Sequence, residues 1–325
     1  MIVFQGGFHG RTIGSVSLTP SNPIYHIRYQ PLMAGVYVAP FPYAYSYGWS
    51  EEETSTFCLK QLRHLLASQT APAETAAVLV EPVQGEGGYV VPPPGFLAGV
   101  QEICREHDIL LIADEVQSGF GRTGTWFAFE HFGIEPDMVV MAKGLASGFP
   151  LSGIAARSEL MQQSPAGSQG GTYGGKAVIC AAAVATLRVM KEEKLLVNSA
   201  EMGAALLSLM RPFQVRYTGI VDVRGLGMMV GIEFELPKTR GLIMPAQKRI
   251  KTDYPGVYYI MGKAIATGKP EKIYYIDYRK DGKRIQEKAG RQYQHDMTPA
   301  KAARLRTNKI EGRELSNAEK RAAEK

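Results

Sequence analysis

The sequence predicts an α/β protein built around a parallel sheet. Three short apolar runs recur along the chain, and each is followed by an ionisable residue. The runs are residues 76–80 before Glu81, residues 109–113 before Asp114 and residues 138–142 before Lys143. Continuous apolar runs separated by helices are typical of strands that are covered on both faces, as in parallel sheets. We therefore expect the three ionisable side chains at the carboxyl edge, where open α/β sheets bind ligands. The alternative is three unrelated strand-end residues in solvated loops.

Helix signals surround these runs. Ser50 followed by three glutamates is typical of a helix start. An apolar stripe at helical spacing comes next, formed by Cys58, Leu62, Leu65 and Leu66. Further helices are expected over 96–107, near 127–132 and over 177–193. A turn at 221–227 and a strand at 229–234 indicate a smaller C-terminal lobe.

The composition is that of an ordinary globular protein, with 325 residues, 45% hydrophobic and 21% charged. Three widely spaced cysteines suit a reducing compartment and form neither a disulfide framework nor a metal-ligand set. The first residues lack the features of a secretory signal, and no apolar run approaches the roughly 18 residues of a membrane span. We therefore expect a cytoplasmic protein without a metal site.

Lys143 and Asp114 suggest a specific chemistry. A lysine at the end of a buried strand is costly as a charge, and desolvation favours the neutral amine that forms a Schiff base. The small residues beside Lys143 are expected to leave room for a reaction partner. A buried carboxylate at Asp114 would hold a pyridinium nitrogen protonated. A strand-end aspartate alone is more often a metal ligand, a phosphate-site residue or a helix cap.

Four motifs in this order resemble the class III aminotransferases, most closely those that act on 4-aminobutyrate. They are EPVQGEGG at 81–88, DEVQSGFGRTG at 114–124, AKG at 142–144 and GTYGG at 171–175. The resemblance covers nearly all of residues 1–243. It implies the large domain of the PLP-dependent transferase fold type I (aspartate aminotransferase-like) at 1–190, with a partial small domain at 191–243.

The resemblance also implies the cofactor, pyridoxal 5'-phosphate (PLP), and its contacts. Lys143 would form the Schiff base and shuttle the proton as general base and acid. Asp114 would pair with the pyridine nitrogen, and Gln117 would bond the ring hydroxyl. Val116 and Phe8 would cover the two ring faces. For Phe8, ordinary core packing is the alternative.

Further roles follow from the same resemblance. His9 would lie beside the cofactor, with ordinary core packing as the alternative. Arg11 would contact a substrate carboxylate, and Glu86 would mask a substrate-binding arginine and swing away for the other substrate. Thr172 would reach the cofactor phosphate across the interface of a homodimer.

The implied reaction is transamination from an ω-amino acid to a 2-oxo acid such as 2-oxoglutarate. A PLP-dependent aminomutase is an alternative that Arg11 and Glu86 disfavour. The family's Ser-Gly phosphate loop and N-terminal lobe are expected before residue 1, and the second substrate arginine has no counterpart here. Lys176 stands where the family usually has asparagine. These departures leave a catalytically dead fragment as a further alternative.

The character of the chain changes near residue 244. Residues 244–325 hold 20 Lys and Arg against 10 Asp and Glu, whereas residues 1–243 hold 17 against 21. Strands are expected over 257–260, 272–279 and 283–288, with a hairpin turn at Asp281-Gly282. Thr298-Pro299 is typical of a helix start, and Ser316 with Glu319 of a capping box.

This basic segment resembles the amino-terminal part of a tyrosine-type phage integrase. Its tyrosine-rich sheet and basic helix predict contacts with duplex DNA. A solvated charged extension is the alternative. The charge switch and the two partial resemblances motivate the hypothesis of a fused reading frame, which sequencing of the neighbouring DNA would test.

Overall fold

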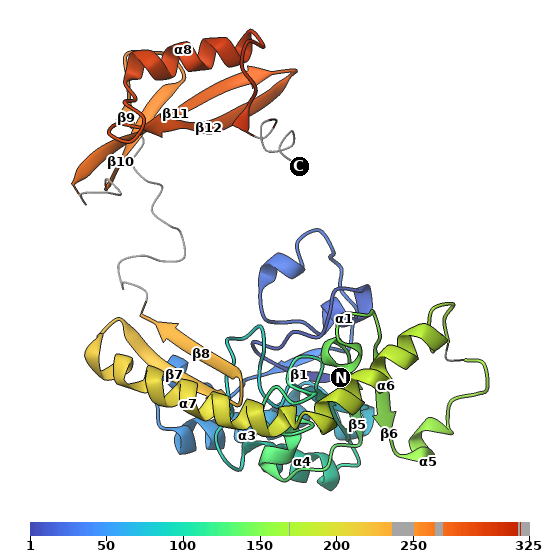
Figure 1. The fold of residues 1–325 in the computed structure, drawn as a ribbon. Helices are drawn as coiled ribbons and strands as arrows, with labels where there is room; N and C mark the ends of the chain where they lie inside the picture. The colour runs from blue at the N-terminus through green and yellow to red at the C-terminus, as the bar shows by residue number, and fades with distance from the viewer. Residues whose placement is uncertain (169, 236–249, 264–268, 318, 320–325) are drawn as a thin grey trace. The chain divides into compact units, whose positions relative to one another are not determined.

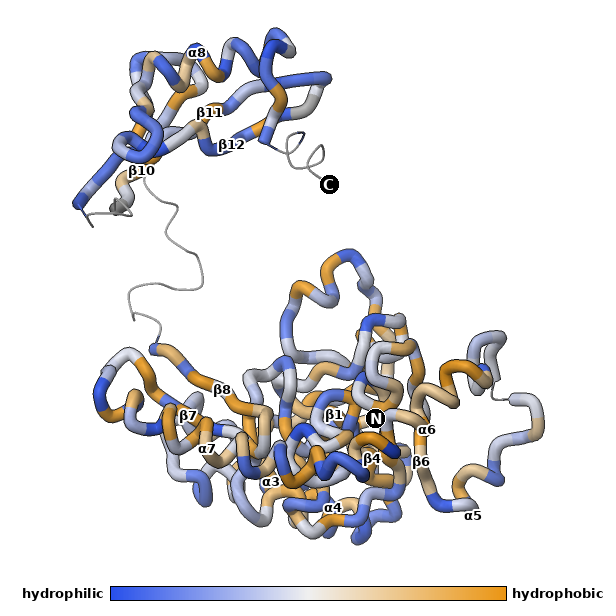
Figure 2. Tube along the Cα trace, in the orientation of Figure 1, coloured by the Kyte–Doolittle hydropathy of each residue, from blue (hydrophilic) through white to orange (hydrophobic). Residues whose placement is uncertain are grey.

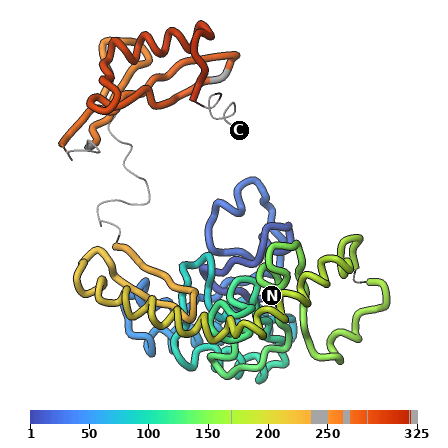
Figure 3. Tube along the Cα trace, viewed as in Figure 1, coloured from blue at the N-terminus to red at the C-terminus, as the bar shows by residue number. Residues whose placement is uncertain are grey.

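The chain forms two compact units, unit 1 (Met1–Glu235) and unit 2 (Leu236–Lys325). The structure is a computed structural model and describes residues 1–168, 170–235, 250–263, 269–317 and 319. Figure 3 follows the chain by colour, from blue to light orange through unit 1 and from orange to red through unit 2. The expected boundary at residue 244 lies outside these ranges, and the division into three parts stays a prediction.

Unit 1 is built on a six-stranded sheet with the order β2-β1-β3-β4-β5-β6. The strands are β1 (Ile2–Phe4), β2 (Tyr37–Ala39), β3 (Ala77–Val80), β4 (Leu110–Asp114), β5 (Met138–Met141) and β6 (Gly153–Ala156). All neighbours pair in parallel except β5 and β6, which are antiparallel. The three apolar runs are thus adjacent parallel strands, as predicted. Ile2–Phe4 adds a strand that the sequence pattern did not reveal.

Helices cover this sheet (Figure 1). The α-helices are α1 (Ile13–Ser17), α2 (Ala44–Tyr47), α3 (Glu51–Ser68), α4 (Phe96–Glu106), α5 (Ser158–Met161), α6 (Ala177–Glu192) and α7 (Leu195–Arg216). The 3-10 turns are η1 (Pro23–Tyr25), η2 (Pro72–Glu74), η3 (Ala128–Phe132) and η4 (Lys143–Ala146). The expected start of α3 is confirmed, because Ser50 Oγ accepts from the Glu53 N–H at 3.2 Å and Glu53 Oε2 accepts from the Ser50 N–H at 3.0 Å. Near 127–132 the structure has a 3-10 turn where we expected a short helix.

The core of unit 1 lies between the sheet, α3 and α4. The predicted stripe of α3, from Cys58 to Leu66, is buried there. Phe4, Phe41 and Phe96 form a cluster of edge-to-face rings, with centroids 5.7–6.1 Å apart. Such contacts add to the stabilisation that burial of the rings gives.

A two-stranded antiparallel hairpin, β7 (Ile220–Leu226) with β8 (Met229–Phe234), ends unit 1. Figure 2 shows the apolar character of β8. The expected turn at 221–227 is therefore wrong, because most of this stretch is strand β7. Helix α7 packs closely on the hairpin: a Cβ atom on Gly203 would lie 2.0 Å from the carbonyl oxygen of Gly227. Only glycine permits that approach.

Unit 2 is a four-stranded antiparallel sheet with one helix. Its elements are β9 (Ile250–Lys251), β10 (Val257–Lys263), β11 (Pro270–Lys280), β12 (Lys283–Arg291) and α8 (Pro299–Ile310), and the strand order is β12-β11-β10-β9. The three predicted strands are confirmed and β9 is additional. Asp281 and Gly282 form the predicted two-residue hairpin turn, with φ +50° and +74°.

Helix α8 lies on one face of that sheet. Along α8, Figure 2 shows polar and apolar residues in alternation, and Ala302 packs against Ile276 and Tyr278 of β11. Lys309 forms a buried ion pair with Glu287, with 2.7 Å between Nζ and Oε1. The reciprocal bonds of Ser316 and Glu319 confirm the predicted capping box. The helix expected after it falls largely on residues that the structure leaves undescribed.

No helix in the described ranges combines the length and apolarity needed to cross a lipid bilayer.

We expect Phe96→Ala to lower the free energy of unfolding of unit 1 by about 3–5 kcal/mol, because it removes a fully buried ring from the three-ring cluster. Both tryptophans, Trp49 and Trp126, lie in unit 1, so tryptophan fluorescence during urea unfolding reports on this unit. Phe149→Ala is the control, since Phe149 is 51% exposed. Equal losses in the two variants would contradict the cluster's role.

Candidate active site

Four neighbouring parallel strands of unit 1 end at one edge of the sheet. Parallel strands place their carboxyl ends on the same side, so the residues that follow them converge. Phe8 and His9 follow β1, Glu81 follows β3, Asp114 ends β4 and Lys143 follows β5. The convergence that the sequence predicted for Glu81, Asp114 and Lys143 thus rests on the observed strand order.

A buried pair forms between His9 and Asp114. The His9 Nδ1 and Asp114 Oδ2 atoms are 2.7 Å apart, and the side chains are 3% and 6% exposed. The second oxygen of Asp114 accepts a hydrogen bond from the Val116 N–H at 3.1 Å. The His9 backbone N–H donates to Thr19 Oγ1 at 2.9 Å. His9 is thus held at both its backbone and its ring, and it orients the carboxylate of Asp114.

Lys143 lies next to the uncharged side chain of Gln117. The Lys143 Nζ donates to Gln117 Oε1 at 2.9 Å. Lys143 has a left-handed backbone conformation, with φ +43°, and it lines an open hollow of about 810 Å³.

One expectation about Lys143 is wrong. The residue is exposed, so this chain alone does not desolvate its amine. Gly144 packs closely on its other side, because a Cβ atom there would lie 2.9 Å from Cβ of Phe120. Gly144 is thus required for close packing against the loop that follows β4.

Glu81 is buried, with 6% of the residue exposed. Its Oε2 accepts from the Phe8 N–H at 2.9 Å, and its Oε1 accepts from the Gly85 N–H at 3.0 Å. Burial raises the pKa of Glu81 to about 7, although the nearby His9 and both N–H groups favour the charged form. The sequence placed Glu81 at the edge, but nothing in it indicated these backbone contacts.

Gly85 brings the loop after β3 against Gln117. A Cβ atom on Gly85 would lie 2.4 Å from the Cδ and Nε2 atoms of Gln117. The side chain of Gln117 therefore occupies the space that any larger residue at position 85 would need.

Arg11 and Glu86 meet at an aromatic side chain that the sequence did not single out. Tyr25 donates its hydroxyl to Glu86 Oε1 at 2.5 Å, and this bond is the main reason that the pKa of Tyr25 is raised. The Arg11 guanidinium lies 4.6 Å from the centroid of the Tyr25 ring and 5.7 Å from that of Phe8. The rings of Phe8 and Tyr25 pack edge to face at 5.1 Å. In this structure the described partner of Glu86 is therefore a tyrosine.

Thr172 has no described contact with these residues. It sits on an exposed loop between α5 and α6, and none of the contacts described for unit 1 joins it to Asp114 or Lys143. Its predicted role in binding phosphate across a homodimer interface stays a prediction. Beside it, the Lys176 Nζ lies 4.7 Å from the centroid of the Tyr173 ring.

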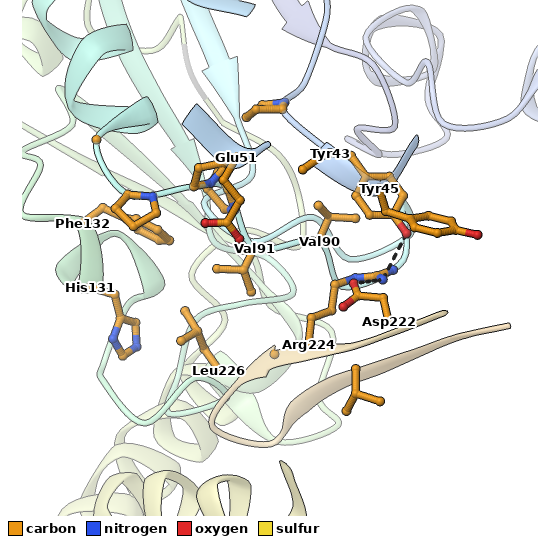
Figure 4. Close-up of a pocket in the computed structure, with 18 of the residues that line it drawn as sticks. Tyr43, Tyr45, Glu51, Val90, Val91, His131, Phe132, Asp222, Arg224 and Leu226 are labelled. Carbon is orange, nitrogen blue, oxygen red and sulfur yellow. Dashed lines mark hydrogen bonds and ion pairs between the residues drawn. The ribbon is translucent and has the colours of Figure 1, made fainter. Parts of the chain in front are cut away.

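A second cavity, of about 690 Å³, lies between the β7–β8 hairpin and the loops around Tyr43 and Val90 (Figure 4). Arg224 bonds Asp222 at 2.7 Å and the Tyr43 hydroxyl at 3.1 Å. It also donates to Glu233 at 2.8 Å and to the Gly88 carbonyl. Arg224 thus ties the hairpin to the rest of unit 1, and its charge is already compensated.

Residues 1–265 match the class III aminotransferase family. The chain is 40% identical over 243 residues to a probable 4-aminobutyrate aminotransferase of Bacillus subtilis, covering 74% of this chain and 56% of that protein. It is 42% identical over 233 residues to the 5-aminovalerate aminotransferase DavT of Pseudomonas aeruginosa, covering 72% and 54%. The chain thus spans about half the length of the curated relatives it matches.

Solved structures agree with this similarity. A PLP-bound amine transaminase from an uncultivated Pseudomonas species superposes with a TM-score of 0.68 at 32% identity, covering 73% of this chain and 56% of that chain. The sheet and helices of unit 1 are accordingly those of the PLP-dependent transferase fold type I, as the sequence predicted. The chain belongs to the class III aminotransferases, a family of transferases whose cofactor is pyridoxal 5'-phosphate.

Proposed function

We propose that this chain carries the cofactor side of an aminotransferase that moves an amino group from an ω-amino acid, of the 4-aminobutyrate type, to a 2-oxo acid such as 2-oxoglutarate. The observation that carries the proposal is the convergence of the His9–Asp114 pair with Lys143 and Gln117 at one sheet edge. Because the chain spans about half of its relatives, the complete reaction is itself part of the proposal.

The residues present fit the pyridine side of PLP. A buried carboxylate at the end of one strand, a primary amine just after the next strand and a side-chain amide beside it form a set of groups suited to a ring nitrogen, an aldehyde carbon and a ring hydroxyl. In this proposal Asp114 holds the nitrogen and Gln117 the hydroxyl. Val116 and Phe8 cover the ring faces, and Lys143 provides the covalent attachment.

PLP, when bound, withdraws electrons from the substrate α-carbon and makes its proton acidic. Asp114 would support this by favouring a positive charge on the ring nitrogen, and His9 holds Asp114 in position. The Lys143 amine would take the proton from the substrate α-carbon as general base and would give it back as general acid. Gln117 orients that amine through the 2.9 Å hydrogen bond.

Arg11 and Glu86 are the residues that we propose for substrate choice. The Arg11 guanidinium lies over the rings of Tyr25 and Phe8, and in this proposal it would bind a substrate carboxylate. Glu86 would change partners between the two half-reactions. The name of the Bacillus subtilis relative supports 4-aminobutyrate as a donor, and that of DavT supports 5-aminovalerate.

A homodimer in the cytoplasm completes the proposal. Large apolar side chains are exposed on unit 1, among them Ile13 (54%), Tyr173 (76%) and Val178 (72%). Exposed apolar groups of this extent are typical of surfaces that bind another chain. A second copy would also bring Thr172 to the cofactor phosphate and cover Lys143. The three free cysteines suit a reducing compartment.

We expect the purified full chain to take up PLP covalently at Lys143. Borohydride reduction followed by peptide mass spectrometry would locate the attached group. Lys143→Ala should abolish the attachment, whereas the matched variant Lys60→Ala should not, because Lys60 is an exposed lysine on α3. Attachment spread over several lysines, or equal in all three proteins, would contradict the assignment.

The transfer itself is tested on chains that have taken up PLP. Incubation with 4-aminobutyrate or 5-aminovalerate and 2-oxoglutarate should release glutamate, which is measured by chromatography. Cofactor attachment at Lys143 without glutamate formation would support the cofactor site and contradict the complete reaction for this chain.

A second candidate function concerns unit 2, and a specific observation favours it. The register of the sheet aligns Lys251, Tyr258, Tyr275 and Lys288 in one row across the four strands. The two tyrosine rings are stacked at 5.5 Å, and both lysines are exposed. This row is on the face opposite to Ile276 and Tyr278, which α8 covers. Cations flanking aromatic rings suit a nucleic-acid backbone, and we propose duplex DNA as a ligand.

We expect the full chain to bind a fluorescent DNA duplex with an affinity that falls steeply as salt rises. Removing one phosphate contact by Lys288→Ala should lower the slope of log K against log salt by about 1. Lys301→Ala is the control, since Lys301 is on α8 and pairs with Asp296. Anisotropy titrations measure both. Salt-independent binding, or equal slopes in all three proteins, would contradict this function and leave a solvated basic extension.

A further inference from the structure

Glu81 is a buried carboxylate to which the proposed chemistry assigns no role. Its two oxygens accept hydrogen bonds from the backbones of two different loops, the Phe8 N–H after β1 and the Gly85 N–H after β3. A buried charge is costly unless it is fully hydrogen-bonded. Glu81 is buried at the point where these two loops meet, and both N–H groups donate to it.

The first loop leads to Asp114. Phe8 is followed directly by His9, whose ring Nδ1 is 2.7 Å from Asp114 Oδ2. The position of the Phe8 backbone therefore fixes the direction from which His9 approaches Asp114.

The second loop leads to Lys143. Gly85 lies so close to Gln117 that a Cβ atom at position 85 would be 2.4 Å from Cδ of Gln117. Gln117 Oε1 in turn accepts from Lys143 Nζ at 2.9 Å. Gly85 therefore packs directly against the group that orients the amine.

We propose that Glu81 is a positioning residue, whose carboxylate holds both loops and thereby keeps Asp114 and Lys143 in register at the sheet edge. The proposal rests on the proposed function, because that function is what gives the register its purpose. Glu81 touches neither Lys143 nor the atoms that would react, so it acts through Phe8 and Gly85.

Two ionisable groups face Glu81 from the surrounding elements. His9, after β1, favours its charged form, and Asp114, at the end of β4, opposes it. The balance leaves a pKa of about 7, above the ordinary value of 4.5, because burial is the largest effect. Glu81 therefore changes its charge within the physiological pH range.

Protonation of Glu81 has opposite consequences for positioning and for stability. The ionised carboxylate accepts both N–H groups in charge-assisted bonds, and protonation converts one oxygen into a donor. The loops are thus held best above pH 7. Between pH 4.5 and 7, however, the folded state binds more protons than the unfolded state, so the contribution of Glu81 to the free energy of unfolding falls as pH rises. If Glu81 only stabilised the fold, the positions of the two loops and the free energy of unfolding would change in the same direction with pH.

The first arm of the test needs no cofactor. Amide NMR spectra of the ¹⁵N-labelled full chain would be recorded between pH 5.5 and 8.5. We expect the Phe8 and Gly85 N–H signals to titrate with one common midpoint near 7, and the Gln117 side-chain amide to follow them. Glu81→Gln should abolish the common titration, because its amide can accept from one N–H and presents a donor to the other. Glu115→Gln is the matched control for the Phe8 and Gly85 signals: Glu115 is also buried, but it accepts from Ser118 and Phe129, which lie outside the two loops that Glu81 holds.

The second arm measures PLP affinity and urea unfolding over the same pH range. At pH 8 we expect PLP to bind about ten-fold more weakly to Glu81→Gln than to the unaltered chain, with the difference shrinking toward pH 6. The unaltered chain should instead lose stability relative to Glu81→Gln as pH rises.

The outcomes separate this proposal from the function on which it rests. Independent or absent titration of Phe8 and Gly85 overturns the positioning role, whatever the chain does with PLP. A PLP affinity that follows stability at every pH overturns it as well. If the amides titrate together but the unaltered chain takes up no PLP, the contact is supported and the proposed function fails.

Discussion

The parallel pairing of β1, β3, β4 and β5 is the constraint on which the candidate site depends. The strands are short, and β1 contributes only Ile2–Phe4. Each places the residues after it at the same edge, so groups more than 100 positions apart in sequence, such as His9 and Asp114, come within hydrogen-bonding distance. The apolar cluster around Phe96 holds the sheet against α3 and α4. The packing of this core thus supports the sheet edge that carries the candidate site.

The structure also explains how one motif serves two purposes. Asp114 and Glu115 are adjacent, yet Asp114 pairs with His9, whereas Glu115 accepts from Ser118 and from the Phe129 N–H. Successive side chains of a strand point to opposite faces, and this alternation continues at the end of β4. Asp114 therefore pairs with His9 at the sheet edge, and Glu115 fixes the loop that carries Gln117.

Local patterns in the sequence were sufficient for much of the fold. The apolar runs, the cap at Ser50, the Asp281-Gly282 turn and the Thr298-Pro299 helix start act within a few residues, so the sequence predicts them. The exposure of Lys143 and the contact between Tyr25 and Glu86 could not be predicted in this way, because they depend on where separate loops meet in space. The same holds for Gly144, whose neighbour Phe120 lies 24 positions earlier. The apolar runs and the family resemblance predicted which residues lie at the sheet edge. Contacts such as that of Tyr25 with Glu86 were found only in the structure.

Lys143 adopts a left-handed backbone conformation that glycine favours. A side chain with a Cβ atom costs about 1 kcal/mol or more in this conformation, which glycine adopts without penalty. Position 143 is thus occupied by a residue that the local backbone disfavours. Only glycine at this position would remove that conformational cost, and glycine has no amine. The conformation of this single residue therefore sets backbone stability against the amine that the proposed chemistry requires.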